Sequence, residues 1–490
     1  MTSFPADQLA NLHRLAPEIV LSVFGIVIMV ADPFLPALRR RVLGWVALAG
    51  AFLALLSVHV AYHFSGLAYS GLITVDSFSV FVHVIVLVAA ILAILGSLDY
   101  LDREGIQRGE YYALVLFAAA GMGILAGANE LVTAFIGLEM SSIASYVLVG
   151  FRRRALVSNE ASLKYFLLGS FATAFFLYGV AMVYGVTGTT RIDEIQRLLP
   201  QDQLPPALAV LGLGLIFVGL GFKVVIAPFQ IYAPDVYEGA PTPVTALLAS
   251  APKAATFALM LRILYVSFNK SGDLWFWAVW ISAVLTMFIG NLAALVQSNV
   301  KRMLAYSSIA HAGYILVAFV AGSAAGVAAV LFYLAAYVLM KVGAFLVVTH
   351  LGQQGEKRIA IQDYAGLGSK QPVLAACFSL FLLSLLGLPA TAGFLGKFFA
   401  FQAALDVRNR WLIALVLIAA INSVIGAYYY LRVMIVMYFQ AQSKDYTPSR
   451  VTPAIGFALV IAAAGTLYLG LVPARVLDFA RAAADSLSLH

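Results

Sequence analysis

The apolar residues of this 490-residue chain form a series of continuous runs. Many of these runs are close in length to the about 20 residues that a helix needs to cross a bilayer. Hydrophobic residues make up 62% of the chain and charged ones 11%, which leaves too little polar surface to cover a soluble globule. A β-barrel would instead show short segments of alternating hydrophobicity. The sequence therefore predicts an all-α polytopic membrane protein.

Hydropathy divides the chain into about fourteen spans. They are expected at residues 16–36, 42–64, 75–98, 111–128, 131–150, 161–187, 207–233, 243–268, 275–296, 303–320, 325–350, 372–405, 411–438 and 452–472. The first run is too long for a signal-peptide core, so it is counted as a span. The twelfth is too long for one straight crossing, and we expect Pro389 to interrupt it.

The basic residues between the spans indicate how the chain is oriented in the membrane. Loops on one side hold most of them, namely Arg39, Arg40, Arg41, Arg103, Arg108, Arg152, Arg153, Arg154, Lys301, Arg302, Lys357, Arg358, Lys370, Lys444 and Arg450. The opposite side holds fewer, namely Arg14, Arg191, Arg197, Lys270, Arg408, Arg410, Arg475 and Arg481. Because cytoplasmic loops carry the excess of Lys and Arg, the first set is expected to be cytoplasmic and both termini periplasmic.

Several other kinds of site are not supported by the sequence. The net charge of +7 comes from scattered residues without a basic patch interleaved with aromatics, so nucleic acid is not an expected partner. The single cysteine, Cys377, excludes a disulfide framework or thiolate metal cluster within the chain. No His or carboxylate spacing predicts a metal site. The glycines at 211–223 lie in an apolar span without phosphate-loop spacing and are expected to allow close helix packing.

The seven basic residues inside the predicted spans, together with Glu139, carry most of the functional information. They are Glu139, Lys164, Lys223, Lys253, Arg262, Lys341, Lys397 and Arg432. A charge at the centre of a span costs roughly 2.5–3.5 kcal/mol on insertion scales, so it is a functional candidate by default. Arg262 and Arg432 lie towards span ends, and we expect their charges to reach the interface. Lys164 lies near the start of its helix and is kept as a candidate.

Ion pairing alone does not account for the central charges. One carboxylate, Glu139, cannot neutralise four lysines, so some of the lysines must be neutral or hydrated. Burial generally lowers the pKa of a lysine. At the ordinary lysine pKa of about 10.4 a proton is released only about once per second, and a pKa of about 7 makes release roughly two thousand times faster. These residues therefore favour proton transfer over a set of buried ion pairs that fixes helix register.

Glu139 also provides a possible switch. A lysine close to this carboxylate is held charged, and a lysine far from it gives up its proton. The sequence leaves open which lysine is the partner.

Prolines lie beside three of the central lysines. The pairs are Pro228 with Lys223, Pro252 with Lys253, and Pro389 with Lys397. Proline frees the carbonyl four residues back, and free backbone at membrane depth is tolerated where it lines a polar cavity or is buried in protein. Interruptions at matching places indicate two inverted five-helix repeats with discontinuous seventh and twelfth helices.

The repeats divide the chain into four parts. An N-terminal three-helix segment covers residues 1–110, the first repeat with spans four to eight covers 111–268, and the second with spans nine to thirteen covers 269–440. A C-terminal helix and tail cover residues 441–490.

Two histidines inside spans have different interpretations. His311 lies in the tenth span, one turn after Ser307 and Ser308, and is a candidate proton relay near neutral pH. A neutral histidine bonded to a neighbouring helix is nearly as well supported. His83, in the third span, is expected to be structural.

At these residues the chain resembles a known family, the antiporter-like membrane subunits of respiratory complex I and of multisubunit Na⁺/H⁺ antiporters. The resemblance is carried by SNEASLKYFLLGSFATAFFLYGVAMVYG at 158–185, FKVVIAPFQIYAPDVYEGAPTPVTALLASAPKAATF at 222–257, KRMLAYSSIAHAGY at 301–314 and LGLPATAGFLGKF at 386–398. These stretches cover the chain from about the fourth span to the thirteenth.

The resemblance implies a role for each buried charge. Glu139 is similar to the family's fifth-span glutamate, and Lys223 to its partner lysine on the broken seventh span. Lys253 is similar to the eighth-span lysine at the centre of a half-channel. His311 is similar to the tenth-span relay histidine.

Two more lysines match family positions on the eleventh and twelfth spans. Lys341 is similar to an eleventh-span lysine, and Lys397 to the twelfth-span residue that leads outward. In the family these groups form a lateral hydrophilic axis that couples quinone reduction elsewhere in the complex to proton translocation. The resemblance implies FMN, iron–sulfur clusters and quinone in partner subunits, with no cofactor in this chain. It also implies a bacterial inner membrane, another antiporter-like subunit and small membrane subunits as partners.

Two features distinguish members of the family. The chain ends soon after its fourteenth span, without the long lateral helix of the largest respiratory subunit, and has Lys397 where the middle one usually has glutamate. A respiratory member other than these two is therefore expected. The alternative is a subunit of a multisubunit Na⁺/H⁺ antiporter, which shares the core motifs. A proton-inert scaffold is a third possibility, although a scaffold has no need of four central lysines.

Overall fold

The structure is a computed structural model that describes residues 6–36, 39–199, 207–269, 272–441 and 450–487. Lys270 and Lys444, which the comparison of loop charges includes, lie outside these residues. The described chain is almost entirely helical, with one short antiparallel hairpin of β-strands.

The N-terminal part contains four helices and this hairpin. They are α1 (Ala6–Arg14), α2 (Ala16–Ala31), α3 (Arg41–His63), β1 (Gly66–Ala68), β2 (Ile73–Val75) and α4 (Ser77–Glu104). Asp76 starts α4 because its carboxylate accepts a hydrogen bond from the Ser79 amide in a capping box. Gly105 ends the helix in the left-handed conformation that glycine adopts without strain.

The middle part contains two divided helices. Its elements are α5 (Gly109–Gly127), α6 (Leu131–Val149), α7 (Leu156–Thr187), α8 (Ile192–Leu198), α9 (Ala207–Val224), η4 (Gln230–Tyr232), α10 (Ala233–Gly239), α11 (Thr242–Leu248), α12 (Ala251–Arg262) and the π-helix η5 (Ile263–Ser267). The predicted seventh span is interrupted after Val224, before Pro228. The predicted eighth span is also divided, at Ala249 and Ser250, so Pro252 lies in the first turn of α12 and not inside a continuous helix.

The C-terminal part contains another divided helix. Its elements are α13 (Gly272–Leu295), α14 (Val300–Phe319), α15 (Ala324–Leu351), η7 (Gln354–Glu356), η8 (Ile361–Tyr364), α16 (Leu367–Lys370), α17 (Pro372–Leu386), α18 (Ala392–Asp406), α19 (Arg410–Phe439), α20 (Pro453–Leu471) and α21 (Ala474–Asp485). The predicted twelfth span consists of α17 and α18 with Pro389 between them. The predicted interruptions of the seventh and twelfth helices are therefore confirmed.

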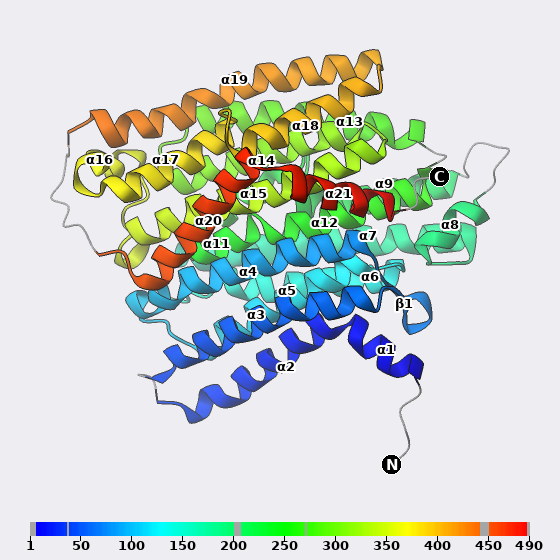
Figure 1. The fold of residues 1–490 in the computed structure, drawn as a ribbon, viewed down its shortest axis with the longest axis horizontal. Coiled ribbons are helices and arrows are strands. Elements are labelled where there is room, and N and C mark those ends of the chain that lie inside the picture. The colour runs from blue at the N-terminus through cyan, green and yellow to red at the C-terminus, as the bar shows by residue number, and fades with distance from the viewer. Residues whose placement is uncertain (1–5, 37–38, 200–206, 270–271, 442–449, 488–490) are drawn as a thin grey trace.

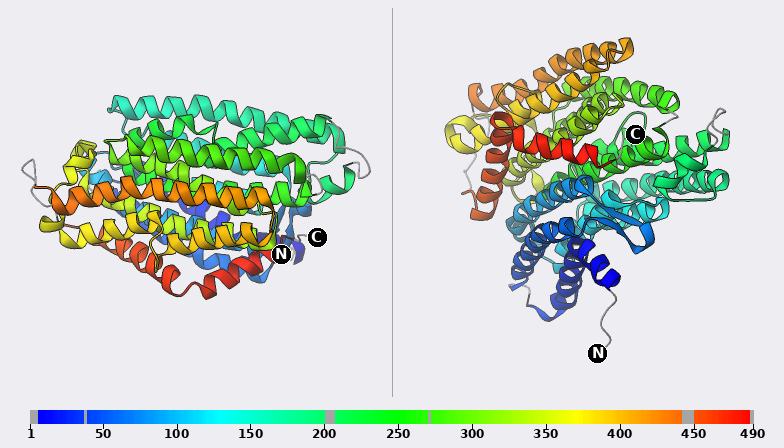
Figure 2. Two further views of the ribbon diagram at one scale, coloured as in Figure 1. Left: turned by 90° about the horizontal axis from the view of Figure 1, so that it is seen from above. Right: turned by 45° about the vertical axis from the view of Figure 1, so that its right-hand side comes forward.

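Most helices lie side by side along one direction and are connected at the two ends of the bundle (Figure 1; Figure 2). Twelve helices in the described residues are long and apolar enough to cross a membrane. Large apolar side chains cover the outside of the bundle, and Phe171 and Val424, for example, are 65% and 74% exposed. Lys253 and Lys341 are buried inside it. This distribution suits a bundle surrounded by lipid, so the all-α membrane fold is confirmed. The count of fourteen, the repeats and the four-part division stay predictions.

The first and last described helices meet the same end of the bundle. Arg14 of α1 donates to the carbonyls of Phe64 and Leu67, beyond the end of α3. The amide of Phe78, at the start of α4, donates to Ser486 just after α21. The other end of α4 carries the arginine-rich loops, which we call the arginine-rich end.

Candidate proton-transfer site

Lys223 lies in the last turn of α9, next to the break. It is 6% exposed, and its Nζ donates hydrogen bonds to Ser142 Oγ at 2.7 Å and Tyr146 Oη at 3.2 Å, both on α6. The ammonium also lies 5.6 Å from the centre of the Tyr165 ring. Carbonyls at the C-terminus of a helix favour positive charge. Because α9 ends at Val224, directly after Lys223, its C-terminus stabilises the protonated lysine without an ion pair.

Glu139 lies on α6, one turn before Ser142. Within the described residues no ion pair joins it to Lys223, and its Oε1 atom is buried without a hydrogen-bond partner. It is close enough to Lys223 to interact with it electrostatically. The structure thus brings the Glu139 carboxylate and the Lys223 ammonium near each other but not into contact. This arrangement corresponds to the state of the predicted switch in which the two groups are apart.

A small cavity connects Lys223 with the divided eighth helix. Its volume is about 10 Å³, close to the smallest space that holds one water molecule. Ser142 and Lys223 line one side, and Pro252 and Thr256 of α12 line the other. The cavity therefore reaches from Lys223 to the helix that carries Lys253.

Lys253, in the first turns of α12, is the second buried lysine. It is 1% exposed, and its Nζ donates to the Ser308 carbonyl at 2.7 Å and to Ser308 Oγ at 2.6 Å. Ser308 Oγ lies 2.6 Å from Tyr337 Oη. These contacts join α12, α14 and α15 through one lysine and two hydroxyl groups.

A longer series of hydrogen bonds begins at Lys341 on α15. Its Nζ donates to Ser307 Oγ at 3.0 Å, and Ser307 Oγ lies 2.5 Å from Tyr430 Oη on α19. Tyr430 Oη lies 3.2 Å from His311 Nε2, and His311 Nδ1 lies 2.8 Å from Tyr333 Oη. Every consecutive pair in this series is within hydrogen-bond distance.

Lys397, on α18, sits beside the break in the twelfth span. It is 7% exposed, and its Nζ donates to the carbonyl of Leu386, the last residue of α17, at 2.9 Å. The ammonium lies 4.6 Å from the centre of the Tyr314 ring. Gly387 allows the turn here through its left-handed φ of +97°. The seventh and the twelfth spans, two of the three divided ones, therefore each place a lysine beside the break.

These groups are the candidates for binding and passing protons. Within the described residues none of Lys223, Lys253, Lys341 and Lys397 forms an ion pair; the lysines that do are Lys164 and Lys301. Their partners are mainly hydroxyl groups and carbonyls. A hydroxyl both donates and accepts a hydrogen bond, so it can pass a proton onward, which a carbonyl cannot. We call the lysines, His311 and their linking Ser and Tyr hydroxyls the lysine row.

Lys164 lies outside this row. Its side chain is 42% exposed and forms ion pairs with Glu160 at 2.6 Å and Asp235 at 2.9 Å. The structure therefore separates this candidate from the other six.

The two arginines inside predicted spans have structural contacts. Arg262 was expected to reach the interface, and this is wrong: it is 5% exposed and pairs with Asp76 at 2.9 Å, because the cap of α4 packs beside α12. Arg432 donates to the carbonyls of Leu295 and Gln297 at the end of α13. That contact caps a helix.

Sequence reasoning missed a buried carboxylate at the arginine-rich end. Glu356, just after α15, pairs with Lys301 and Arg152, each at 2.9 Å. Tyr100 Oη and the amide and hydroxyl of Thr242 also donate to it. Burial alone would raise the pKa of Glu356, but the two cations and the donors hold it below its ordinary value. The loop-charge comparison includes Lys301 as a loop residue, although it is buried. Nothing in the sequence shows that loops of distant segments pack over it.

A second missed pair lies towards the other end. Glu18 of α2 is 7% exposed, and its Oε1 lies 2.5 Å from Nε2 of His83 on α4. Glu18 lies near the start of the first span. A carboxylate is common at the end of a span, so the sequence does not single it out. This pair joins two N-terminal helices, which agrees with a structural role for His83.

Replacing Tyr430 by phenylalanine should interrupt the lysine row without opening a cavity. The variant loses the hydroxyl that lies between Ser307 and His311 and keeps the ring. We expect proton translocation to fall about tenfold, since one transfer group is removed. Tyr111→Phe is the matched control, because Tyr111 Oη lies 2.8 Å from Ser97 Oγ, outside the row. Equal losses in both variants, measured in membrane vesicles, would count against a role for Tyr430.

Lys164→Met tests whether this exposed lysine contributes. Exposed ion pairs contribute little, so translocation and assembly should change by less than about twofold. A loss as large as that from Lys253→Met would return Lys164 to the proton path.

Comparison with known proteins identifies the family to which the chain is similar. Residues 128–426 match the family model described as NADH:quinone oxidoreductase/Mrp antiporter, TM. NADH-quinone oxidoreductase subunit N 1 of Solibacter usitatus is 48% identical over 484 residues, covering 99% of each chain. NADH-quinone oxidoreductase subunit N of Trichlorobacter lovleyi is 45% identical and covers 97% of each.

Chains with the same fold occur in solved structures of different complexes. A chain of respiratory complex I from Thermus thermophilus with bound aureothin has a TM-score of 0.79 and 36% identity, covering 94% of this chain and 98% of that one. A chain of the Mrp complex from Dietzia has a TM-score of 0.86 and 22% identity, covering 98% and 97%. The second likeness concerns the fold alone.

Proposed function

Because this chain belongs to the NADH:quinone oxidoreductase/Mrp antiporter family of membrane proteins, we propose that it moves protons across the membrane as subunit N of a bacterial NADH–quinone oxidoreductase. The chain is then part of an enzyme, because it is a subunit of an H⁺-transporting translocase. The redox reaction would take place in other subunits, which carry the FMN, iron–sulfur clusters and quinone site.

One observation carries this proposal: four lysines and a histidine are buried in the bundle, bonded to hydroxyl groups and backbone carbonyls and without ion pairs among the described residues. A buried charge without a counter-ion is unfavourable, so each lysine is poised to release a proton when its surroundings change. A scaffold would need none of these groups at membrane depth.

The proposed path starts at the divided seventh helix. A proton on Lys223 would pass through the small cavity to Lys253, and from there through the hydroxyls of Ser308 and Tyr337 towards Lys341. Lys341 and Lys397 both lie close enough to His311 to act on it electrostatically. Adding a proton to one member therefore makes its neighbours more ready to lose theirs.

The remaining steps lead to the divided twelfth helix. Ser307 and Tyr430 link Lys341 to His311, and Lys397 stands at the far end of the row beside the break between α17 and α18. We propose Lys397 as the group that passes the proton outward.

Glu139 is the proposed switch for the first step. When its carboxylate approaches Lys223, the ammonium form is stabilised; when it withdraws, the lysine passes its proton on. Glu139 stands apart from Lys223 here, with one oxygen free of hydrogen bonds among the described residues, so it has the freedom to make this approach.

The proposed setting is the bacterial inner membrane. The arginine-rich end would face the cytoplasm and both termini the periplasm. The proposed partners are another antiporter-like subunit and the small membrane subunits of the complex, together with the surrounding lipid.

An affinity tag on this chain tests the assignment. We expect the purified complex to oxidise NADH with a quinone and, in vesicles, to pump protons when NADH is supplied. The alternative is a subunit of a multisubunit Na⁺/H⁺ antiporter, which shares the fold. Sodium-driven proton exchange, without NADH oxidation by the tagged complex, would favour the antiporter and contradict the proposal.

A further inference from the structure

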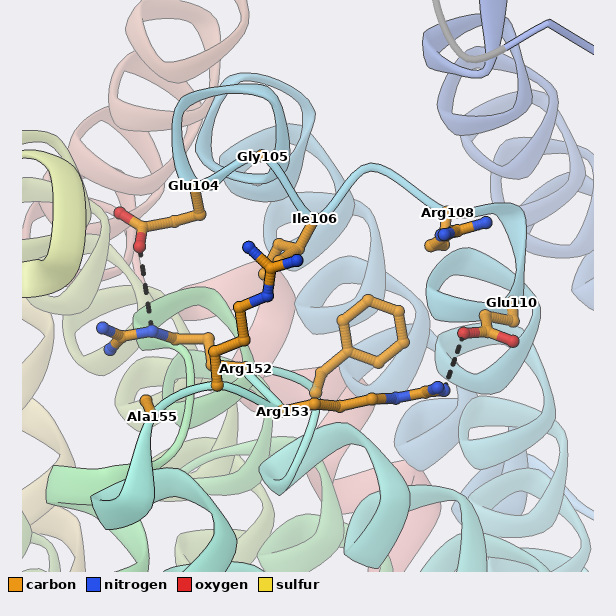
Figure 3. Close-up of a pocket in the computed structure, with 10 residues that line it drawn as sticks. Glu104, Gly105, Ile106, Arg108, Glu110, Arg152, Arg153 and Ala155 are labelled. Carbon is orange, nitrogen blue, oxygen red and sulfur yellow. Dashed lines mark hydrogen bonds and ion pairs between the residues drawn. The ribbon is translucent and has the colours of Figure 1, made fainter.

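Charged side chains pair at both ends of the bundle, outside the lysine row. At the arginine-rich end, Arg152 lies at a cavity of about 620 Å³ and pairs with Glu104 at 3.7 Å (Figure 3). Arginine keeps its charge over the whole physiological pH range, so this pair does not depend on a bound proton. The pair of Glu18 and His83, towards the opposite end, is of a different kind.

Both ring nitrogens of His83 face hydrogen-bond acceptors. Nδ1 lies 2.6 Å from the carbonyl oxygen of Ser79, and Nε2 lies 2.5 Å from Oε1 of Glu18. A carbonyl only accepts, so Nδ1 carries a hydrogen. A neutral imidazole has one N–H, so its Nε2 would meet the carboxylate of Glu18 as one acceptor against another. The contact between Nε2 and Oε1 therefore requires one further proton, carried by His83 or by Glu18.

The surroundings of this pair are closed and leave little room for water. The side chains of His83 and Glu18 are 12% and 8% exposed, and Oε2 of Glu18 has no hydrogen-bond partner among the residues that the structure describes. Gly123 of α5 forms one wall, where a Cβ atom would lie 2.5 Å from Glu18 Oε1 and 3.0 Å from His83 Nε2. A buried carboxylate is costly without a partner, so the shared proton stabilises the pair.

Asp76 is a further charged group close to the pair. It lies at the start of α4, near enough to His83 to interact with it electrostatically, and Arg262 of α12 pairs with it at 2.9 Å. Ionisable groups on the other helices packed against α2 or α4 have contacts of their own: His13 of α1 with Phe64, Arg14 of α1 with backbone carbonyls, His59 with His63 on α3, Tyr111 of α5 with Ser97, Lys253 of α12 and Lys341 of α15 with serines of α14, and Asp478 with Arg481 on α21.

We propose that Glu18 and His83 form a proton-binding site in which one shared proton joins α2 to α4. Release of this proton to water would leave a carboxylate and a neutral imidazole, with one N–H for two acceptors. The bond to Ser79 or the bond to Glu18 is then lost. The contact of α2 with α4 is therefore complete at low pH and weakens as the pH rises. None of these groups belongs to the lysine row, so this site is independent of the proposed proton path.

Deuterium exchange at the imidazole C2 position, resolved by mass spectrometry of peptides, reports the pH at which each histidine loses its proton. The wild type and Glu18→Gln would be compared, each purified in its native complex. Glutamine has nearly the size of glutamate, and its amide can donate to Nε2 of a neutral His83 without a shared proton. We expect the midpoint of exchange at His83 to lie about one to two pH units lower in Glu18→Gln than in the wild type. His59, which contacts His63 instead, is the internal control and should not change.

Gly123→Ala is a second variant that keeps both groups of the pair. The added Cβ would displace the carboxylate from Nε2, so the midpoint at His83 should fall in the same direction. Gel filtration of the purified complex checks the assembly of each variant. The same midpoint in the wild type and in Glu18→Gln, or in Gly123→Ala if the first variant does not assemble, would overturn the proposal.

Discussion

Lys253→Arg should abolish proton translocation almost as completely as Lys253→Met. Arginine keeps the positive charge but does not release its proton at physiological pH, because the pKa of its guanidinium group lies far above that pH. Lys253 donates its hydrogens to Ser308, and we propose that it hands a proton onward there. We expect NADH-driven pumping to fall roughly a hundredfold in both variants, the usual size of the effect when a proton-transfer group is lost.

The arginine variant separates proton transfer from a fixed charge. If Lys253 only supplied a positive charge to hold α12 against α14, arginine would restore much of the activity. Lys370→Arg, at an exposed position of α16, is the control for the substitution itself and should pump normally. Pumping by Lys253→Arg close to the wild-type level would contradict a transfer role for Lys253.

Glu356→Ala should destabilise the subunit by about 3–5 kcal/mol, because it leaves the buried cations Lys301 and Arg152 without their counter-ion. It also removes the acceptor for the amide and hydroxyl of Thr242, at the start of α11. The partners of this carboxylate come from four segments: α4, the loop after α6, α11 and α14. Its loss should therefore loosen the start of α14, the helix that also carries Ser307 and Ser308. Thermal unfolding of the purified complex is the measurement.

A surface pair serves as the control for this prediction. Asp478→Ala breaks the exposed pair of Arg481 and Asp478 and should change stability by less than about 1 kcal/mol. Glu356→Gln should fall between the two, because the amide keeps some of the hydrogen bonds. A Glu356→Ala variant as stable as Asp478→Ala would show that the buried cluster is not a structural centre.

The stability contribution of Glu356 should also depend on pH. Its pKa in the folded chain lies below the ordinary value of 4.5, so the unfolded chain takes up a proton first as the pH falls. The contribution is therefore complete well above pH 4.5 and is lost progressively below it. A difference between wild type and Glu356→Gln that persists unchanged at pH 3 would contradict this.

The sequence predicted the parts of the fold that depend on long patterns. Apolar runs located the spans, and Pro228 and Pro389 marked two of the breaks correctly, because proline excludes the hydrogen bond that a continuous helix needs. The eighth span reads as one run from 243 to 268, and its division at Ser250 depends on packing that no local signal shows.

The candidate site was predictable where a residue is unusual in a span. A lysine among leucines and valines stands out, and the structure places Lys223, Lys253, Lys341 and Lys397 inside the bundle. The hydroxyls that link them do not stand out, because a tyrosine such as Tyr430 is equally common in an ordinary apolar core. Glu356 lies among charged loop residues, where only the packing of distant segments reveals its burial.

NADH-driven proton pumping in inverted membranes that carry Lys223→Ala tests the central claim most directly, with assembly of the complex and NADH–quinone turnover measured in parallel. Lys223 stands at the start of the lysine row, near Glu139 but not in contact with it. We predict that pumping and turnover fall together, roughly tenfold or more, while the complex stays assembled. Pumping and turnover at the wild-type level would contradict the account, since protons would then cross by another route or by another subunit.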